Sequence, residues 1–390
     1  MKTQICIIGG GPSGLLLAQL LNNNAIDTVV IERRNKEHVL SRIRAGVLEQ
    51  GFSKMMRDAG CGERMDKEGE VHSGFQIADG NRLKRIDLSK LTGGRTVMVY
   101  GQTELTRDLY DARERANGLT IYNVEDVNLN DLTTDAPVVE FSVNGETEQI
   151  YCDLVVGADG FHGVSRKSIP KGKLTEHGRT YPFGWLGILS RTKPVSSELV
   201  YARHSRGFAL CSMRNKLLSR YYIQVPISDS VEDWSDDRFW NELRSRLPDS
   251  LLSSLETGSS IEKSIAPLRS YVAEPMSYGN LFLAGDAAHI VPPTGAKGLN
   301  SAGADIYYLY RAILDRYLRD DKTGLDNYSS KALTRVWKTQ RFSWWMTSLL
   351  HVFPEATSFE KRLQESELNY LLSSENALSL LAENYVGLPY

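Results

Sequence analysis

The hydrophobic pattern at the start of the chain changes its spacing twice. Residues 3–8 form an apolar, β-branched run, a glycine-rich turn follows, and residues 15–21 have the composition of a helix. A second apolar run at residues 27–31 ends at the acidic residue Glu32. A strand, a turn, a helix and a second strand in this order are typical of a parallel βαβ unit. The pattern therefore predicts an α/β fold that begins with a nucleotide-binding unit.

The middle of the chain has a different pattern. Residues 71–99 alternate weakly between apolar and polar side chains, which predicts strands and hairpins inserted into the first unit. From residue 181 to residue 267, β-branched and aromatic residues alternate in place of the glycine turns, with one helical segment near residues 236–247. We therefore predict a second, mostly antiparallel sheet domain in this segment.

The last third of the chain is predicted to be mostly helical, because apolar residues recur at steps of three and four over residues 302–381. The aromatic segment at residues 337–350 fits internal packing or a contact between two copies of the chain. We therefore divide the chain into a first domain at residues 1–180, a sheet domain at residues 181–267, and a segment at residues 268–390 that ends in helices.

The turn at residues 9–14 reads GGGPSG. Gly9, Gly11 and Gly14 match the G-x-G-x-x-G pattern, in which the glycines make a tight turn, let the backbone approach a pyrophosphate and allow close packing of helix on strand. Glu32 lies where a carboxylate hydrogen-bonds a ribose hydroxyl. The strand context and the acid favour a dinucleotide over a turn without a ligand, and they leave FAD and NAD both open.

A cluster of basic residues follows the second strand. Its members are Arg33, Arg34, Lys36 and His38, and Arg42 and Arg44 come next. A short charge run is usually a solvated helix face. The first four equally fit a site for the phosphates of a nicotinamide dinucleotide, where the additional phosphate favours NADPH over NADH. For the last two, a contact with a pyrophosphate is the alternative to a surface position.

Two further turns carry single carboxylates. The strand predicted at residues 151–156 ends in a glycine turn with Asp159, and a short apolar strand before residue 284 leads to Asp286 and then into a helix. Such turns expose backbone N–H groups and favour a negatively charged ligand. His72, in the alternating segment, gains no special weight, because a lone histidine is more often structural than catalytic.

Two neighbouring strands of the predicted sheet domain carry a candidate receptor for a carboxylate. Ser212 and Arg214 share parity, so both point to one face if the strand continues, and Tyr222 lies on the next strand. The guanidinium offers a bidentate fork and the hydroxyls complete the shell. A solvated sheet face with an exposed arginine fits the same pattern.

Composition narrows the classes of function. The 390 residues are 41 % hydrophobic and 24 % charged, and the formal net charge of −2 gives no field that attracts nucleic acid. No apolar run is long enough to cross a bilayer, and the N-terminus lacks the pattern of a signal peptide, so we expect a cytoplasmic protein. The four cysteines lack Cys-x-x-Cys spacing, and we expect neither a metal site nor a disulfide framework.

Five segments together resemble a known family. GGGPSG at residues 9–14, DLVVGADG at 153–160 and LAGDAAHIVPPTGAKGLN at 283–300 are similar to the FAD fingerprints of the class A flavoprotein aromatic hydroxylases. RIRAGVLEQG at 42–51 and SMRNKLLSRYY at 212–222 resemble the members that act on 4-hydroxybenzoate. The resemblance spans almost the whole chain. It implies a Rossmann-like FAD-binding domain of glutathione-reductase type, a substrate-binding sheet domain, and an FAD-contacting segment before the C-terminal helices.

The resemblance also assigns cofactor roles. It implies that FAD is bound by Gly9, Gly11, Ser13, Gly14, Glu32, Arg33, Arg42, Arg44, Gln102, Asp159, Asp286, Leu299 and Asn300. The candidates for the nicotinamide nucleotide are Arg33, Arg34, Lys36, His38 and Arg44. With three flavin fingerprints in one chain, FAD is the expected resident cofactor, and NADPH, or alternatively NADH, is a co-substrate together with O2.

The implied substrate site contains Tyr201, Ser212, Arg214, Tyr222, Pro293 and Thr294. The arginine and its two hydroxyl neighbours would receive a carboxylate. Tyr201 would bind the substrate phenol and pass its proton through Tyr385 to His72 at the surface, while the carbonyl of Pro293 would lie against the substrate ring.

The implied function is hydroxylation of 4-hydroxybenzoate to 3,4-dihydroxybenzoate through a flavin C4a-hydroperoxide, in a homodimer. Two alternatives stand beside it. A related FAD hydroxylase of another phenolic acid, 3-hydroxybenzoate or a dihydroxybenzoate, would share the FAD segments and differ in the pocket. A protein of another class, a non-catalytic binding protein with an FAD fold, would need no proton relay.

Overall fold

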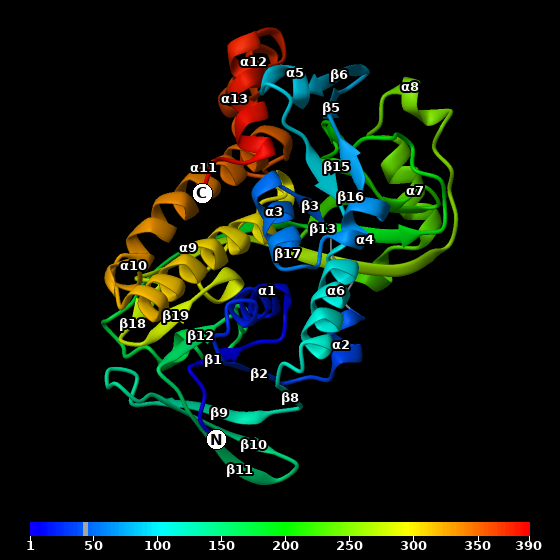
Figure 1. Ribbon diagram of the computed structural model, residues 1–390. Coiled ribbons are helices and arrows are strands. Elements are labelled where there is room, and N and C mark those ends of the chain that lie inside the picture. The colour runs from blue at the N-terminus through cyan, green and yellow to red at the C-terminus, as the bar shows by residue number, and fades with distance from the viewer. Residues whose placement is uncertain (42–45) are drawn as a thin grey trace.

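The computed structural model describes residues 1–41 and 46–390. Two large sheets organise the molecule, and helices pack between them and around them (Figure 1). The predicted α/β class is confirmed.

The first sheet has six strands in the order β18-β19-β12-β1-β2-β8. These are β18 (Ser277–Tyr278), β19 (Leu281–Leu283), β12 (Leu154–Gly157), β1 (Ile5–Ile8), β2 (Thr28–Glu32) and β8 (Thr120–Tyr122). β18 runs antiparallel to β19, and the other neighbours are parallel. Every residue of β1 is buried, as expected for a parallel strand that is covered on both faces. The strand, turn, helix and strand predicted at the N-terminus are confirmed.

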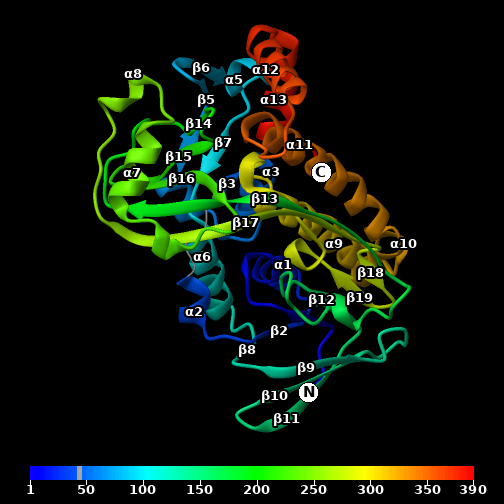
Figure 2. The ribbon, with the colours of Figure 1, turned by 180° about the vertical axis from the view of Figure 1, so that it is seen from behind.

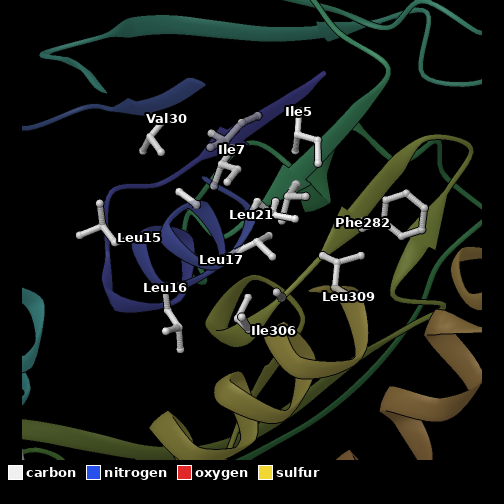
Figure 3. Packing of buried hydrophobic residues seen from close by; sticks show 14 of the residues in the cluster. Ile5, Ile7, Leu15, Leu16, Leu17, Leu21, Val30, Phe282, Ile306 and Leu309 are labelled. Atoms are coloured by element: carbon white, nitrogen blue, oxygen red, sulfur yellow. The ribbon is translucent and has the colours of Figure 1, made fainter. Parts of the chain in front are cut away.

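Helix α1 (Pro12–Asn22) is buried between this sheet and α9 (Gly298–Arg319) (Figure 3). Proline suits the first turn of a helix, because the N–H that it lacks has no partner there. The packing in Figure 3 joins Leu15, Leu16, Leu17 and Leu21 of α1 with Ile5, Ile7 and Val30 of the sheet and Ile306 and Leu309 of α9. A helix that is apolar all round belongs in a core. This packing fixes the start of α1, and with it the glycine turn, at the carboxyl edge of the sheet.

The second sheet has eight strands in the order β20-β17-β13-β16-β15-β14-β5-β6. These are β20 (His289–Ile290), β17 (Ser260–Glu274), β13 (Thr175–Ser190), β16 (Leu218–Pro226), β15 (Ala209–Asn215), β14 (Val200–Arg203), β5 (Gly74–Asp79) and β6 (Arg82–Asp87). All neighbours are antiparallel except β14 and β5. The segment at residues 71–99 thus supplies two strands to the sheet predicted at residues 181–267, and β13 crosses residue 180. The three-part division of the chain stays a prediction.

Two small sheets complete the β-structure. Their strands are β9 (Glu125–Asn130), β10 (Val138–Val143) and β11 (Glu146–Tyr151) in one, and β3 (Val47–Leu48), β7 (Val97–Val99) and β4 (Glu70–His72) in the other. The β9–β11 sheet lies at one end of the molecule beside the N-terminus, and α12 and α13 lie at the other end (Figures 1 and 2).

The other helices flank the sheets. They are α2 (Lys36–Leu40), α3 (Gln50–Asp58), α4 (Glu63–Glu68), α5 (Leu88–Leu91), α6 (Gln102–Arg115), α7 (Asp236–Arg244), α8 (Asp249–Leu252), α10 (Thr323–Asp326), α11 (Tyr328–Leu350), α12 (Ser358–Ser373) and α13 (Glu375–Val386). Short 3-10 helices lie at η1 (Arg166–Ser168), η2 (Val231–Asp233), η3 (Gly285–Ala287) and η4 (Pro293–Gly295). The predicted helical C-terminal region is confirmed, with its first helix beginning at Gly298.

Candidate active site

A cavity of about 790 Å³ lies between the carboxyl edge of the first sheet and the second sheet. Binding sites for cofactors and small ligands are usually concave and largely preformed, and this volume is within their range of about 300–1,000 Å³. Its lining includes the predicted site residues Gly9, Gly11, Ser13, Glu32, Arg33, Arg34, His38, Gln102, Asp159, Tyr201, Ser212, Arg214, Tyr222, Asp286, Pro293 and Leu299. Segments that are far apart in the sequence therefore meet at one cavity.

The glycine turn before α1 has a shape that side chains would block. Gly9 has φ of 114°, and a Cβ there would come within 2.3 Å of the Ala158 carbonyl oxygen. A Cβ on Gly14 would lie 2.1 Å from the Gly9 carbonyl oxygen. A Cβ on Gly11 would meet nothing within 4 Å, although Gly11 lines the cavity. The turn thus leaves room for a ligand at Gly11, next to the helix end that favours negative charge.

The carboxylate of Glu32 is held beside this turn. Its Oε2 accepts a hydrogen bond from the Gly10 N–H at 2.8 Å, and its Oε1 accepts one from the Arg34 N–H at 3.0 Å. The Tyr110 hydroxyl donates to the Gly10 carbonyl at 2.7 Å. Two backbone N–H groups, one from the glycine turn and one from the residue two positions after Glu32, therefore orient this carboxylate at the cavity.

Asp159 is held in a similar way at the next turn. Its Oδ2 accepts hydrogen bonds from the N–H and the hydroxyl of Ser165, both at 2.9 Å. Burial raises the pKa of Asp159, and the two bonds from Ser165 oppose that rise. Its Oδ1 is buried and has no hydrogen-bond partner among the described residues, so it is an acceptor available to a ligand hydroxyl.

The turn with Asp286 is clamped by a buried pair that we did not predict. Asp305 of α9 accepts hydrogen bonds from the Gly285 N–H at 2.9 Å and from His289 Nε2 at 2.6 Å. Burial alone lowers the pKa of His289, but the Asp305 carboxylate raises it overall. Asp305 thereby ties both ends of the turn to α9 and leaves Asp286 exposed at the cavity. The sequence contains one signal for this pair, the histidine three residues after Asp286, because histidines are commonly buried beside a carboxylate in a structural role.

The basic residues after β2 differ in whether they line the cavity or pair with acidic residues. Lys36 pairs with Glu114 at 2.7 Å and with Asp111 at 3.4 Å, and it does not line the cavity. Arg33, Arg34 and His38 do line it. Arg42 and Arg44 lie outside the described residues. Phe161, His162 and Arg269 are among the lining residues that sequence reasoning missed.

The carboxylate receptor predicted on β15 and β16 lies at the opposite end of the cavity. The Nη1 of Arg214 donates to the Met213 carbonyl at 3.2 Å, while Nε and Nη2 are buried without a hydrogen-bond partner among the described residues. Burial lowers the pKa of Arg214. Ser212 donates to the Arg220 carbonyl at 2.8 Å. Because buried guanidinium nitrogens are normally paired, these two nitrogens suit an anionic ligand, and the face is not a solvated one.

The two predicted tyrosines of the relay are in direct contact. The hydroxyl oxygens of Tyr201 and Tyr385 are 2.9 Å apart, and the Phe75 ring stacks on Tyr385 with centroids 4.2 Å apart. Burial raises the pKa of Tyr201 to about 12, and it raises the pKa of Tyr385 well above its ordinary value. Both phenols therefore stay protonated at neutral pH and are able to accept one proton while passing on another.

His72 departs from the prediction that it lies at the surface. It is 3 % exposed, because β4 packs it against the body of the protein beside Val97 of β7. Burial lowers the pKa of His72. Among the described residues, its Nδ1 has no hydrogen-bond partner and no hydrogen bond joins it to Tyr385. The surface position was wrong, and the last link of the relay stays a prediction.

Around η4, two predicted site residues use their side chains within the protein. Thr294 is buried and shares a 2.9 Å hydrogen bond with Thr347 of α11. Asn300 donates to the Val47 carbonyl at 2.8 Å and accepts from the Glu49 N–H at 2.8 Å. Neither of the two residues lines the cavity. Pro293 and Leu299 line the cavity, as predicted for a wall between two ligands.

A buried charge cluster that the sequence did not reveal supports the position of Tyr385. Glu49 pairs with Lys297 at 2.7 Å and with Arg335 at 2.9 Å. Lys297 donates to the Tyr385 carbonyl at 2.7 Å, and Arg335 donates to the Leu388 carbonyl at 2.6 Å. The cluster fixes the end of the chain against the cavity. Single charged residues at distant positions give no pattern by which to find it.

Comparison with known proteins identifies the family. A family model described as FAD binding domain matches residues 2–343. The chain is 53 % identical over 390 residues to p-hydroxybenzoate hydroxylase of Acinetobacter baylyi, covering 100 % of this chain and 96 % of that protein. The chain belongs to the class A FAD-dependent aromatic hydroxylases. The predicted FAD-dependent monooxygenase, with NAD(P)H and O2 as co-substrates, is thereby confirmed.

More distant hydroxylases share the fold. The chain is 25 % identical over 348 residues to 6-methylpretetramide 4-monooxygenase of Streptomyces rimosus, covering 82 % of this chain and 77 % of that protein. It superimposes on the crystal structure of p-nitrophenol 4-monooxygenase from Pseudomonas putida DLL-E4 with a TM-score of 0.84, at 18 % identity over 100 % of both chains. At this identity the second likeness supports the fold alone.

Two features bear on the environment of this hydroxylase. In residues 1–41 and 46–390, no helix has the length and apolarity needed to span a bilayer. Within the same ranges, no three or more His, Cys, Asp or Glu side chains are grouped to hold a metal ion.

The residues at the first-sheet end of the cavity fit FAD. Gly11 leaves open space at the start of α1, Glu32 is oriented beside it, and Asp159 Oδ1 is a buried acceptor without a partner in residues 1–41 and 46–390. A dinucleotide has a pyrophosphate for the first and hydroxyl groups for the other two.

Proposed function

We propose that this hydroxylase converts 4-hydroxybenzoate to 3,4-dihydroxybenzoate. The observation that carries the proposal is the pairing of two groups in one compartment. One is Arg214, whose Nε and Nη2 are buried without a partner among the described residues, and the other is the linked phenols of Tyr201 and Tyr385. An aromatic acid with a para hydroxyl presents a carboxylate to the first group and a phenol to the second. The name of the Acinetobacter baylyi relative agrees with this substrate.

In the proposed complex, Arg214 binds the carboxylate, assisted by the hydroxyl of Tyr222 and by that of Ser212, which turns from the Arg220 carbonyl to donate to the ligand. A guanidinium fork orients a carboxylate with two parallel hydrogen bonds. This contact fixes the direction of the ring axis, so the carbon next to the phenol, and not another carbon, faces the Pro293 side of the cavity.

Tyr201 binds the phenol and makes the ring more reactive. Electrophilic hydroxylation needs the phenolate, and a phenol with a pKa of about 10 is ionised in only about one molecule in a thousand at pH 7. Tyr201 accepts the proton while its own proton passes to Tyr385, over the 2.9 Å between their oxygens. We propose that His72 takes the proton onward.

FAD occupies the other end, at Gly9, Gly11, Ser13, Gly14, Glu32, Arg33, Arg42, Arg44, Gln102, Asp159, Asp286, Leu299 and Asn300. When bound, FAD supplies the redox chemistry that couples oxidation of a nicotinamide nucleotide to activation of O2. Gly298 and Leu299 begin α9, and this helix end favours the negative charge that a reduced ring carries.

NADPH is the proposed electron donor. Arg33, Arg34 and His38 face the cavity, and Arg44 belongs to the same proposed set, whereas Lys36 is engaged with acids of α6. Charge at this position favours the additional phosphate of NADPH. We expect kcat/KM to be higher with NADPH than with NADH, and Arg34→Ala to narrow the difference more than Lys36→Ala. Equal efficiencies with the two nucleotides would reject this preference.

We also propose a homodimer. Several large apolar side chains on the C-terminal helices are exposed, namely Trp344, Phe359, Leu363, Tyr370 and Leu380. Exposed apolar groups of this size are typical of a contact surface. Sedimentation velocity is expected to give twice the mass of the chain. The cytoplasmic location and the absence of a nucleic acid partner stay predictions.

The proposed function is tested by one assay with several acids. NADPH oxidation by the FAD-loaded protein is measured with 4-hydroxybenzoate, 3-hydroxybenzoate, 3,4-dihydroxybenzoate or no acid, and the products are separated by chromatography. We expect strong stimulation by 4-hydroxybenzoate and stoichiometric 3,4-dihydroxybenzoate. Stronger, coupled turnover of another phenolic acid would assign that acid as the substrate instead.

A further inference from the structure

A buried histidine lies behind the wall of the substrate compartment. His351 follows the last residue of α11 and is fully buried. Its Nδ1 lies 3.0 Å from the Thr347 carbonyl oxygen, and its Nε2 lies 2.7 Å from the indole Nε1 of Trp185. A carbonyl only accepts and an indole N–H only donates, so these partners fix the proton on Nδ1 and leave Nε2 as the acceptor.

The surroundings of His351 disfavour a charged imidazole, because burial outweighs the hydrogen bond to the Thr347 carbonyl. The ring stacks on Phe183, Trp185 and Phe208, with centroids 4.9, 5.9 and 4.4 Å away. Burial lowers the pKa of His351 to about 3. A protonated ring would also turn Nε2 into a donor that faces the indole N–H. The imidazole is therefore a permanent acceptor for Trp185.

Trp185 is the link between this histidine and the cavity. It lies on β13, beside Gln224 of β16 and Ala266 of β17. Its indole lines the cavity, as do Tyr201 and Tyr222, and its ring centroid lies 5.2 Å from that of Tyr222. The ring thus forms part of the wall between the proposed phenol and carboxylate contacts.

The position of His351 is itself fixed from two directions. Gln224 accepts from the Val352 N–H at 3.0 Å and from the Phe208 N–H at 3.0 Å, which ties the end of α11 to the second sheet. Gln364 of α12 donates to the His351 carbonyl at 2.8 Å. An acceptor held this rigidly restricts the indole to one orientation.

We infer that His351 is a positioning residue for catalysis, which sets the orientation of the Trp185 indole and through it the fit of the aromatic ring. The inference rests on the proposed function, since it assigns the wall to a phenolic acid. Without the acceptor, the buried indole N–H has no partner, and the indole rotates or admits water. The ring of the substrate is then held less firmly, and oxygen transfer fails more often than NADPH oxidation does.

The test compares His351→Leu, His351→Gln, Trp185→Phe and the double variant His351→Leu/Trp185→Phe. Glutamine restores an acceptor in a side chain of similar reach, and phenylalanine removes the donor but keeps an aromatic wall. The matched control is His177→Leu, because His177 is an exposed histidine whose ring lies 5.5 Å from that of Trp337, outside the cavity lining. For each protein we measure the Kd for 4-hydroxybenzoate, the yield of product per NADPH and the FAD content.

We expect His351→Leu to raise the Kd at least tenfold and to lower the product yield severalfold, with normal FAD content. His351→Gln is expected to recover most of both losses, and His177→Leu to match the wild type. In the double variant, where no indole N–H is left without a partner, the loss is expected to be smaller than the product of the two single losses.

Losses that multiply in the double variant, or a His351→Leu protein that is only less heat-stable with wild-type Kd and yield, would overturn the inference. The indole N–H resonance of Trp185, assigned with Trp185→Phe in ¹⁵N-tryptophan-labelled protein without substrate, separates this outcome from failure of the proposed function. A shift of that resonance in His351→Leu would show that the indole N–H is hydrogen-bonded to His351 in the wild type. This result holds even if the wild type does not turn over 4-hydroxybenzoate. An unshifted resonance rejects the contact itself.

Discussion

The two ends of the active-site cavity are built in different ways. The FAD end consists of turns whose glycines and backbone groups form most of the predicted site. Each turn directly follows a parallel strand of the first sheet. The aromatic end consists of side chains from β13, β14, β15 and β16, supported from behind by α11 and α13. A backbone site needs a short local motif, whereas a side-chain site needs the whole fold to bring its members together.

This difference also separates two kinds of specificity. A nucleotide is bound by repeating features such as glycine turns and helix ends, which serve many proteins. The aromatic end selects its ligand by one guanidinium with unpaired nitrogens and one pair of phenols. Changes at the aromatic end should therefore alter substrate binding and leave FAD bound, and changes at the FAD end should do the reverse.

The largest expected effect is at Arg214. Removal of one partner of a buried ion pair costs about 3–5 kcal/mol, which is roughly a hundredfold or more in Kd. We expect Arg214→Ala to raise the Kd for 4-hydroxybenzoate by that factor, measured by titration of the flavin absorbance. The FAD content should stay normal. Arg203→Ala is the control, because Arg203 lies on the neighbouring β14 and pairs with Asp79. If Arg214→Ala is saturated by the same concentrations of 4-hydroxybenzoate as the wild type, Arg214 does not bind the carboxylate.

Gly11 gives the reciprocal test at the FAD end. A Cβ on Gly11 meets no protein atom within 4 Å, so Gly11→Val should fold with a near-normal Tm as apoprotein and bind FAD at least tenfold more weakly, measured by quenching of flavin fluorescence. Gly14→Ala should instead lower the Tm, because its Cβ meets a backbone oxygen at 2.1 Å. Undiminished FAD affinity in Gly11→Val would place the pyrophosphate elsewhere.

A smaller effect is expected at Tyr385, which supports the phenol contact and does not line the cavity. Tyr385→Phe removes the hydroxyl 2.9 Å from that of Tyr201. Substrate binding and flavin reduction should persist, but the product per NADPH should fall severalfold and hydrogen peroxide should rise. Tyr151→Phe, at an exposed tyrosine outside the cavity lining, is the control. Full coupling in Tyr385→Phe would exclude the proposed relay.

The smallest effect is a change in the pH dependence of stability at the aromatic end. Below the ordinary histidine pKa of about 6.5 the unfolded chain takes up a proton, while native His351 does not until its pKa of about 3. His351 therefore favours unfolding as the pH falls, by up to about 1.4 kcal/mol per pH unit. Urea unfolding at pH 6.5 and 5.5 should show a shallower loss in His351→Leu than in the wild type. Equal slopes would mean that His351 is not held neutral.

The sequence predicted the FAD end in most of its parts. The order of strand, glycine turn, helix and strand, the acid Glu32 and the turns with Asp159 and Asp286 are all local patterns. What it missed there are long-range supports, such as Asp305, which lies twenty residues along the chain from the Gly285 N–H that it accepts. Such a contact exists only once α9 packs on the sheet.

Fewer features of the aromatic end could be predicted from the sequence on physical grounds alone. The parity of Ser212 and Arg214 predicted a shared face, but burial of the guanidinium decided between a receptor and a solvated surface. The roles of Tyr201 and Tyr385, 184 positions apart, came from family resemblance. His72 was placed at the surface and is buried, since a three-residue strand carries no signal of which side is covered. His351 and Lys297 had no local pattern that could reveal them.

The central claim is that one cavity holds FAD at one end and a phenolic acid at the other, with the η4 turn between them. Titration of the FAD-loaded protein with 4-hydroxybenzoate, followed by flavin absorbance and by calorimetry on the same sample, tests it directly. We expect a saturable flavin spectral change with one acid bound per FAD and the same Kd by both methods. Calorimetric binding that leaves the flavin spectrum unchanged, or no binding at all, would contradict it.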